Sequence, residues 1–428
     1  MLASAPYSGD AHKQPRPARR RGQSSIGPMT DSGVDLGALT HGTEEVLPDG
    51  MLAKQLAEGT PLRVKLGIDP TAPDIHLGHV VVLSKLAQFQ AVGHTVVLII
   101  GDFTARVGDP SGRDSQRPIL TPEEIEANAK TFQDQAFKVL DPDRTEVRFN
   151  SEWLQMPVDE LFGLVGKVTV AQLLAREDFR KRMAEERPLS VLELLYPILQ
   201  GYDSVAIESD LELGGTDQKF NLLLARDIQQ AHGQPGQSII TLPILPGLDG
   251  ERRMSKSLGN YVGVTEPPEE MFGKLLSIPD TAMGTYYELL LGEGLPSALE
   301  PNEAKRALAR RLVDRFHGEG AGAAAEGHFN RIHKQGEIPA DVEEVDLDAI
   351  EGLHIHDSPD TSVHLPALLA GAFEISTSEA RRLLKQGGVK LDGKLLPAEP
   401  LDVPLSELGG KVLQVGKRRF RAIPANRP

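Results

Sequence analysis

The chain has 428 residues, carries 46 Lys and Arg against 61 Asp and Glu, and contains no cysteine. Its net charge of −15 argues against nucleic-acid binding over the whole surface, so any basic patch must be local. The lack of cysteine excludes disulfides, thiolate zinc sites and thiol nucleophiles. No apolar run approaches the roughly 18 residues of a membrane-spanning helix, and the length allows two or three domains.

The beginning of the chain differs in composition from the remainder. Arg16 and the arginines at 19–21 lie among Pro, Ser, Gly and Gln with almost no apolar side chain, which is typical of disorder. We expect residues 1–35 to be a solvated basic tail or an over-extended gene start, with Met29 as initiator. A transit peptide is the alternative, whereas the absence of an apolar stretch excludes a secretory signal.

Strand and helix signals alternate over residues 36–262, which predicts a Rossmann-like α/β domain with a parallel sheet. Residues 64–68 are typical of a strand, and residues 96–100 form a continuous, mostly β-branched run typical of a buried parallel strand. The capping box at 121–124 predicts a helix to about residue 140.

Apolar residues at helical spacing over 263–317 predict a helical domain, which we assign to residues 263–345. Two stretches lack this spacing, the Gly/Ala-rich 318–327 and the acidic 338–360, and both are typical of linkers. We expect the linker between the helical domain and the C-terminal module at residues 346–361.

Residues 362–428 reverse the charge, with eleven Lys and Arg against six acidic residues, a net +5. A capping box at 376–379 predicts a helix, and Asp392-Gly393 between two short apolar runs predicts a type I′ hairpin. A small basic α+β module on an acidic protein predicts contact with a polyanion. Its candidate RNA-binding residues are Arg381, Arg382, Lys385, Lys417, Arg418 and Arg419.

Two short signatures indicate the chemistry, and the first is His76-Leu77-Gly78-His79. It follows a strand-to-helix turn, where a helix N-terminus attracts phosphate, and Gly78 permits close approach of a nucleotide. We expect the two histidines on one helix face, where they could donate to an α-phosphate as charge develops on it. Taken alone, they could equally be helix-capping or surface histidines.

The second signature is Arg253-Met254-Ser255-Lys256-Ser257, which follows the turn-rich stretch 246–250 and is therefore expected in a loop. Two cations among small hydroxyl residues suit a mobile clamp that neutralises leaving pyrophosphate. Taken alone, this could be a solvated charged loop. In this order on an α/β chain, the two signatures together predict an ATP-dependent adenylating site.

A polar stripe on an apolar helix indicates the substrate. Tyr196, Gln200 and Asp203 are spaced i, i+4, i+7 among apolar neighbours. Buried polar groups need partners, and a ligand with an amino group at one end and a phenol at the other could supply them. The alternative is a structural hydrogen-bond network between helices.

In combination these motifs resemble the bacterial tyrosyl-tRNA synthetases, which are class I enzymes, from about residue 36 to the C-terminus. The resemblance is carried by the histidine signature, the 253–257 loop and the segments 66–71, 108–113, 196–203 and 214–218. The C-terminal module is similar to the S4-type RNA-binding fold. The resemblance implies a ligase that makes tyrosyl-adenylate from tyrosine and ATP, then transfers tyrosine to the 3′-terminal adenosine of its tRNA.

The resemblance also implies a role for each site residue. As catalytic residues it assigns His76, His79, Arg253 and Lys256. As ATP contacts it implies Gly67, Asp69, Gly78, Thr104, Gly215, Asp217, Met254, Ser255, Lys256 and Ser257. As tyrosine contacts it implies Asp109, Tyr196, Gln200, Asp203 and Gln218, with Asp203 accepting from the phenol. Loss of the hydroxyl would leave that buried acceptor unpaired, so phenylalanine would be rejected without editing.

Two positions depart from the pattern of the family. Arg253 stands where Lys is commonest, and Lys65 stands where many members carry a Tyr that helps to read the substrate hydroxyl. Reading the hydroxyl would therefore fall more heavily on Asp203.

The expected partners are tRNA, tyrosine and ATP. Magnesium should arrive with ATP, because no carboxylate cluster indicates a protein metal site. The resemblance implies a cytoplasmic homodimer with tRNA across both subunits, the helical domain near the anticodon and the basic module on the long arm. Three alternatives remain: a tryptophanyl-tRNA synthetase, a small-molecule nucleotidyltransferase and a catalytically idle RNA-binding relative. The polar stripe and the basic module favour tyrosine.

Overall fold

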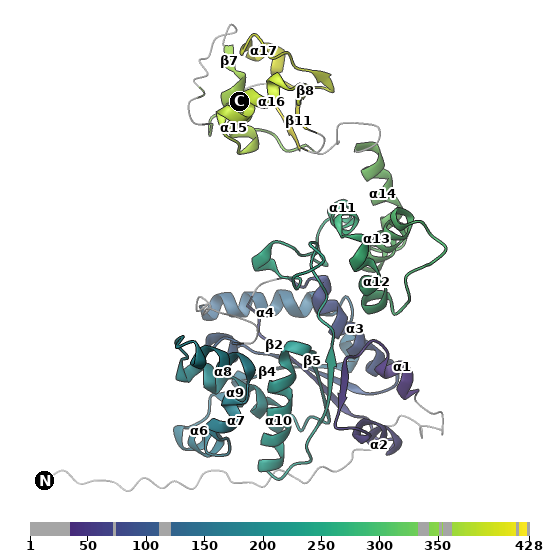
Figure 1. The fold of residues 1–428 in the computed structure, drawn as a ribbon, viewed down its shortest axis with the longest axis vertical. Helices are drawn as coiled ribbons and strands as arrows, with labels where there is room; N and C mark the ends of the chain where they lie inside the picture. Colours follow the sequence, from purple (N-terminus) through teal and green to yellow (C-terminus); the bar gives the residue numbers. More distant parts are fainter. Residues whose placement is uncertain are drawn as a thin grey trace, which may run out of the picture.

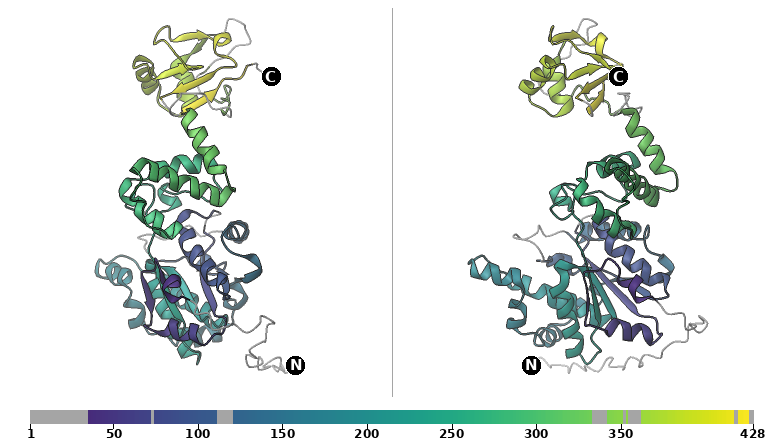
Figure 2. Two further views of the ribbon diagram at one scale, coloured as in Figure 1. Left: turned by 90° about the vertical axis from the view of Figure 1, so that its right-hand side faces the viewer. Right: turned by 45° about the vertical axis from the view of Figure 1, so that its right-hand side comes forward.

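The computed structural model describes residues 35–71, 74–110, 121–332, 342–350, 353, 362–416 and 419–425. Predictions about residues 1–34, about 111–113 and about Lys417 and Arg418 lie outside these ranges. Within them, a helix-covered sheet is followed by a layer of helices and a small C-terminal module (Figures 1 and 2).

The main sheet has six strands in the order β1-β6-β5-β2-β3-β4, all parallel except β1. The strands are β1 (Glu45–Leu47), β2 (Arg63–Ile68), β3 (Thr95–Ile100), β4 (Thr145–Phe149), β5 (Leu211–Gly215) and β6 (Ser238–Leu242). Both predicted strands are confirmed, and residues 96–100 are fully buried. Because parallel strands end at one edge, the segments that follow β2, β3 and β5 meet there.

Helices surround the sheet, some packed on its strands and others on neighbouring helices (Figure 1). Before β5 these are α1 (Leu36–Thr40), α2 (Met51–Ala57), α3 (Leu77–Ala91), α4 (Pro122–Ala136), α5 (Ser151–Leu154), α6 (Val158–Val165), α7 (Val170–Leu174), α8 (Glu177–Ala184) and α9 (Val191–Ala206), and after it α10 (Lys219–Ala231). The α4 helix begins at the predicted capping box but ends at Ala136, short of the expected residue 140. The chain leaves the helix in tight turns that bury Leu140.

The helices predicted over 263–317 are confirmed. They are α11 (Pro268–Ser277), α12 (Met283–Tyr286), the π-helix η6 (Tyr287–Leu291) and α13 (Pro301–His317), and a further helix, α14 (Ala321–Asn330), follows them. The prediction of a linker at 318–327 was wrong, because most of this stretch lies in α14. A Cβ on Gly322 would lie 2.3 Å from the carbonyl oxygen of Arg310, so small residues here allow α14 to approach α13. The apolar core of the sheet continues into these helices.

The C-terminal module has its own apolar core. It contains β7 (Ser362–His364), α15 (Leu365–Phe373), α16 (Thr377–Lys385), β8 (Val389–Leu391), β9 (Lys394–Leu395), β10 (Asp402–Pro404), α17 (Leu405–Leu408), β11 (Val412–Val415) and β12 (Arg419–Ala422). Asp392 and Gly393 have φ of 46° and 75°, as a type I′ turn requires. Val345 and Leu347 pack in this core, although we expected them at the end of the helical domain and in the linker.

Candidate active site

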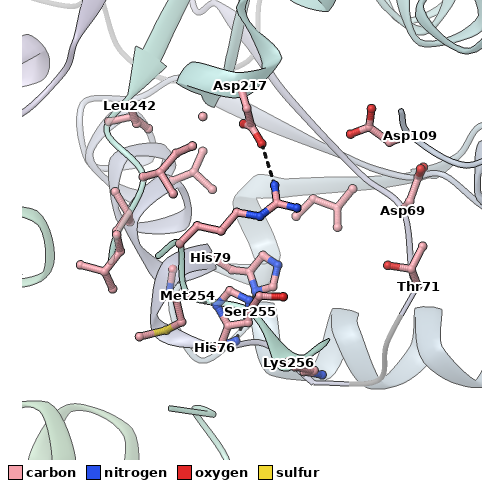
Figure 3. Close-up of a pocket in the computed structure, with 18 of the residues that line it drawn as sticks. Asp69, Thr71, His76, His79, Asp109, Asp217, Leu242, Met254, Ser255 and Lys256 are labelled. Atoms are coloured by element: carbon pink, nitrogen blue, oxygen red, sulfur yellow. Dashed lines mark hydrogen bonds and ion pairs between the residues drawn. The ribbon is translucent and has the colours of Figure 1, made fainter. Parts of the chain in front are cut away.

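A cavity of about 560 Å³ lies at the carboxyl edge of the sheet, and both signatures line it (Figure 3). The predicted site residues around it are Asp69, His76, Gly78, His79, Asp109, Gly215, Asp217, Arg253, Met254, Ser255, Lys256 and Ser257. The fold therefore brings together two sequence segments that lie far apart in the chain. Tyr196, Gln200, Asp203, Gln218, Thr104 and Gly67 are not among the residues that line this cavity.

The two histidines form the N-terminal cap of α3. His76 is the N-cap residue, and its Nδ1 accepts from the backbone N–H of Gly78 at 3.1 Å. The Nδ1 of His79 accepts from the backbone N–H of His76 at 3.2 Å. A neutral imidazole that accepts at Nδ1 carries its proton on Nε2, so each ring is a donor at Nε2.

Burial, the neighbouring His79 and the charge of Lys256 lower the pKa of His76 to about 2. Burial and Lys256 lower the pKa of His79 to about 4. Both rings are therefore neutral at physiological pH, and they can donate hydrogen bonds to a phosphate without carrying charge themselves.

Packing explains the glycine at two of the three predicted glycine positions of the site. A Cβ on Gly78 would lie 2.9 Å from Cε1 of His76, so the capping ring itself requires glycine there. A Cβ on Gly215 would lie 2.8 Å from a carboxylate oxygen of Asp217. A Cβ on Gly67 would meet none of the described protein atoms within 4 Å, so packing does not explain this glycine.

The cations of the second signature reach carboxylates on other segments. Nη1 of Arg253 lies 3.5 Å from Oδ2 of Asp217, and Nζ of Lys256 lies 3.3 Å from Oδ2 of Asp74. Burial lowers the pKa of Lys256, and the nearby Asp74 opposes this shift. The arrangement places two cations beside the cavity that the neutral histidines also line.

Asp69 joins this cavity to the polar stripe of α9. It accepts a hydrogen bond from the hydroxyl of Thr104 at 2.7 Å and one from the hydroxyl of Tyr196 at 2.9 Å. A Cβ on Gly101 would lie 2.1 Å from the Asp69 carboxylate, so this close approach requires glycine. Burial and the charge of Asp69 raise the pKa of Tyr196 well above its ordinary value, so Tyr196 remains a hydroxyl donor.

The predicted tyrosine-binding residues are linked by hydrogen bonds. The Gln218 amide donates to Asp109 at 2.9 Å. Asn221 on α10 donates to the amide oxygen of Gln200 at 2.9 Å and to that of Gln218 at 3.1 Å. We did not predict Asn221 from the sequence. A signal was present, since Asn221 lies one turn after Gln218 at the start of a helix that packs on α9.

Asp203 is buried, with 3 % exposure. Its carboxylate accepts from the indole N–H of Trp153 at 2.8 Å and from the amide of Asn150 at 3.5 Å. Burial raises the pKa of Asp203 to about 7, although Lys65, Trp153 and Asn150 all act in the opposite direction. Asn150 and Trp153 were missed, although they directly follow β4, at the edge where functional residues gather.

The comparisons with known proteins agree with this geometry. Residues 57–334 match the family described as class I tRNA synthetases (W and Y). A tyrosine–tRNA ligase of Moorella thermoacetica is 49 % identical over 399 residues, which cover 89 % of this chain and 94 % of the relative. A tyrosine–tRNA ligase of Syntrophotalea carbinolica is 48 % identical over 390 residues, which cover 88 % and 93 %. The chain belongs to the tyrosine–tRNA ligase family.

Solved structures of tyrosyl-tRNA synthetases share its fold. That of Archaeoglobus fulgidus, complexed with L-tyrosine, has a TM-score of 0.54 at 23 % identity and covers 68 % of this chain and 97 % of its own. A truncated mitochondrial enzyme of Coccidioides posadasii has a TM-score of 0.55 at 20 % identity, with coverages of 67 % and 88 %.

Lys65, which we expected to stand in place of a Tyr of the resembled family, lies inside the protein with 0 % exposure. Its Nζ lies 2.8 Å from a carboxylate oxygen of Glu212, and it donates to the hydroxyl of Ser204 at 2.8 Å. Neither Glu212 nor Ser204 was predicted, because nothing in the local sequence shows that β2 and β5 are neighbours.

The expected RNA-binding side chains are exposed where the structure describes them. Arg381, Arg382 and Lys385 project from α16. Arg419 on β12 lies with its guanidinium 5.7 Å from the Phe373 ring centroid. Among the described residues no cluster of three potential His or carboxylate ligands could hold a metal ion. Within the same ranges, no helix has the length and apolar character needed to cross a membrane.

Proposed function

We propose that this member of the tyrosine–tRNA ligase family activates L-tyrosine with ATP and transfers the tyrosyl group to tRNA. The observation that carries the proposal is the hydrogen bond from Tyr196 to Asp69. It joins the cavity lined by both signatures to a buried polar stripe that ends in Asp203. An adenylating site beside buried polar groups that can pair with a phenol is what tyrosine activation needs.

Activation requires stabilisation of negative charge that develops on the α-phosphate. We assign this role to the Nε2 donors of His76 and His79, which are neutral and fixed by their backbone hydrogen bonds. Lys256 and Arg253 would neutralise the leaving pyrophosphate. Magnesium would arrive bound to ATP and add charge neutralisation at the phosphates. No general base or covalent nucleophile is required, because positioning supplies much of the rate.

Opposite ends of the pocket would hold opposite ends of tyrosine. Asp109, Tyr196 and Gln200 would bind the ammonium group, with Gln218 beside the substrate. Asp203 would accept from the phenolic hydroxyl, held by Trp153 and Asn150. Among the ATP contacts, Gly67, Asp69, Thr104 and Asp217 would surround the nucleotide with the loop residues Met254, Ser255 and Ser257.

We also propose a cytoplasmic homodimer. Large apolar side chains are exposed on adjoining helices, with exposures of 63 % for Val158 and 71 % for Phe162 on α6, and of 63 % for Val170 on α7. Val191 at the start of α9 is 72 % exposed. Exposed large apolar side chains are typical of a protein interface, and a second copy of the chain is the partner that we propose.

The tRNA would contact the basic C-terminal module, which carries Arg381, Arg382 and Lys385 on one helix. These side chains suit the phosphates of the long arm, and the α11–α14 helices would face the anticodon. We place the catalytic domain at 36–262, the helical domain from 263 and the RNA-binding module at 362–428, with Val345 and Leu347 added to the last.

ATP–pyrophosphate exchange tests the activation step, with each of the twenty amino acids in turn and no tRNA present. Exchange with tyrosine alone is the expected result. Exchange with tryptophan would move the assignment to the sister specificity within the family. No exchange with any amino acid would overturn the proposal and favour a catalytically idle RNA-binding protein.

A further inference from the structure

A fully buried ion pair lies beneath the polar stripe of α9. Lys65 on β2 and Glu212 on β5 stand opposite each other in the parallel register. Their side chains are 0 % and 1 % exposed, and Nζ lies 2.8 Å from Oε1. Removing two charges from water is costly, and replacing such a pair by apolar residues is often neutral or stabilising. Stability alone is therefore a weak explanation for this pair.

The ammonium group of Lys65 is enclosed by protein groups. Besides Glu212, it donates to the hydroxyl of Ser204 at 2.8 Å and to the carbonyl oxygen of Gln200 at 3.2 Å. The side chain is also fully buried, with 0 % exposure. Lys65 therefore cannot replace a tyrosine hydroxyl at this position as a direct reader of the substrate.

Its partners place Lys65 directly against the segment that carries Asp203. Ser204 is the next residue in the chain, and Gln200 lies one turn earlier on the same helix. Glu212 is held in turn by the hydroxyl of Ser204 at 3.1 Å and by the amide of Gln237. The positive charge of Lys65 and the negative charge of Glu212 are thus held in fixed positions near the Asp203 carboxylate. Because this region is buried, water screens these charges little.

The pair of Lys65 and Glu212 is the main source of charge that acts on Asp203, as its other neighbours show. From its own helix it faces Tyr196, which is kept neutral by burial. From the β4 side it meets Asn150 and Trp153, and beyond the Trp153 ring lies Arg148, which pairs with Glu152. On the β3 side, Val97 and Ile99 pack in one apolar cluster with the Trp153 ring.

We propose that Lys65, in its pair with Glu212, is a positioning residue for tyrosine selection, which keeps Asp203 a carboxylate acceptor for the substrate phenol. This inference rests on the proposed function and deepens it. Burial of Asp203 favours the neutral acid, which accepts a phenolic hydrogen bond less well than the carboxylate does. Lys65 opposes that tendency and Glu212 adds to it. The two partners of one ion pair should therefore affect tyrosine recognition in opposite directions.

The test is the KM for tyrosine in ATP–pyrophosphate exchange, measured against pH from about pH 5.5 to about pH 8.5. Below the midpoint of the Asp203 titration, the KM for tyrosine should rise about tenfold for each unit by which the pH falls. Lys65→Met should move this midpoint to higher pH, and Glu212→Gln should move it to lower pH. The double variant K65M/E212Q lacks both buried charges, and its midpoint should lie no higher than that of Lys65→Met.

Two internal controls separate this role from a structural one. The KM for ATP should not follow the same midpoint, and kcat/KM for phenylalanine should not fall with falling pH, because phenylalanine has no hydroxyl. Equal midpoints in all four proteins, or shifts of Lys65→Met and Glu212→Gln in the same direction, would overturn the inference. If Lys65→Met does not fold, the comparison of Glu212→Gln with the wild type still decides it. Absence of tyrosine-dependent exchange in the wild type would instead overturn the proposed function.

Discussion

The rings of His76 and His79 lie with their centroids 3.9 Å apart and their planes tilted by 30° at the start of α3. Such close contact between two imidazoles is compatible with neutral rings and disfavours protonation of either one. The pair therefore serves as two fixed N–H donors rather than as a proton-transfer couple, and this distinction leads to a kinetic prediction.

His79→Ala should lower the rate of adenylate formation about 10²–10³-fold, the usual loss for a donor that contacts developing charge. The KM for tyrosine should change little, because the predicted tyrosine-binding residues on α9 are unchanged. Pre-steady-state adenylate formation separates the two quantities. His79→Gln, which offers an N–H donor, should recover part of the rate, and equal losses in rate and tyrosine affinity would contradict the assigned role.

The same histidines predict the pH dependence of kcat for exchange at saturating tyrosine. With a pKa of about 2 for His76 and of about 4 for His79, neither ring titrates near neutrality. No inflection attributable to an ordinary histidine, near pH 6.5, is expected in kcat. An inflection near pH 6.5 that disappears in His79→Ala would show that the ring does take up a proton in the enzyme.

Lys256 should matter more to activation than the other cations of its loop. Lys256→Met removes a charge beside the phosphates and should lower kcat for exchange about 10²-fold. Arg252→Met is the matched control, because Arg252 is exposed and pairs with Asp249 at 2.9 Å. Arg253→Lys retains the charge and should lower kcat much less than Lys256→Met does. A larger loss in Arg252→Met than in Lys256→Met would contradict this order.

Local patterns in the sequence predicted much of the fold. The apolar run at 96–100 predicts a strand, the capping box at 121–124 a helix start, and Asp392-Gly393 a turn. Each pattern depends only on residues close together in the sequence. The pair of Lys65 with Glu212 could not be predicted in this way, because it depends on which strands lie side by side. The linker prediction for the Gly/Ala-rich stretch failed for the same reason. In the sequence Gly322 indicates flexibility, and only the structure shows that it allows α13 to pack closely against α14.

That packing predicts different effects for two glycines of α14. Gly322→Ala would place a Cβ 2.3 Å from the Arg310 carbonyl oxygen and should lower the free energy of unfolding by about 1–3 kcal/mol. At Gly327 a Cβ would meet only a guanidinium nitrogen of Arg331 at 3.7 Å. Gly327→Ala should raise the free energy of unfolding by up to about 1 kcal/mol, through helix propensity. Denaturant unfolding compares them, and similar effects would mean that α14 is not packed in this way.

Removal of the C-terminal module should separate activation from tRNA charging. Because Val345 and Leu347 belong to the core of the module, a cut before residue 342 should leave fewer unpaired apolar side chains than a cut before residue 362. The shortened chain should retain pyrophosphate exchange and lose most tRNA charging. The full-length variant R381A/R382A/K385A is the control for charge alone. Unchanged charging by the shortened chain would show that the module is dispensable.

The apolar side chains on α6 and α9 predict the effect of a charge at the subunit interface. Phe162 is 71 % exposed, and burial of such a side chain in a dimer is worth about 1.5–3 kcal/mol. Phe162→Glu should therefore weaken dimerisation at least about tenfold, which light scattering during size-exclusion chromatography would detect over a dilution series. Leu395→Glu is the matched control, since Leu395 is 62 % exposed on the C-terminal module, away from this surface. A wild type that is monomeric throughout would contradict the proposed dimer, and dissociation of Leu395→Glu alone would place the interface elsewhere.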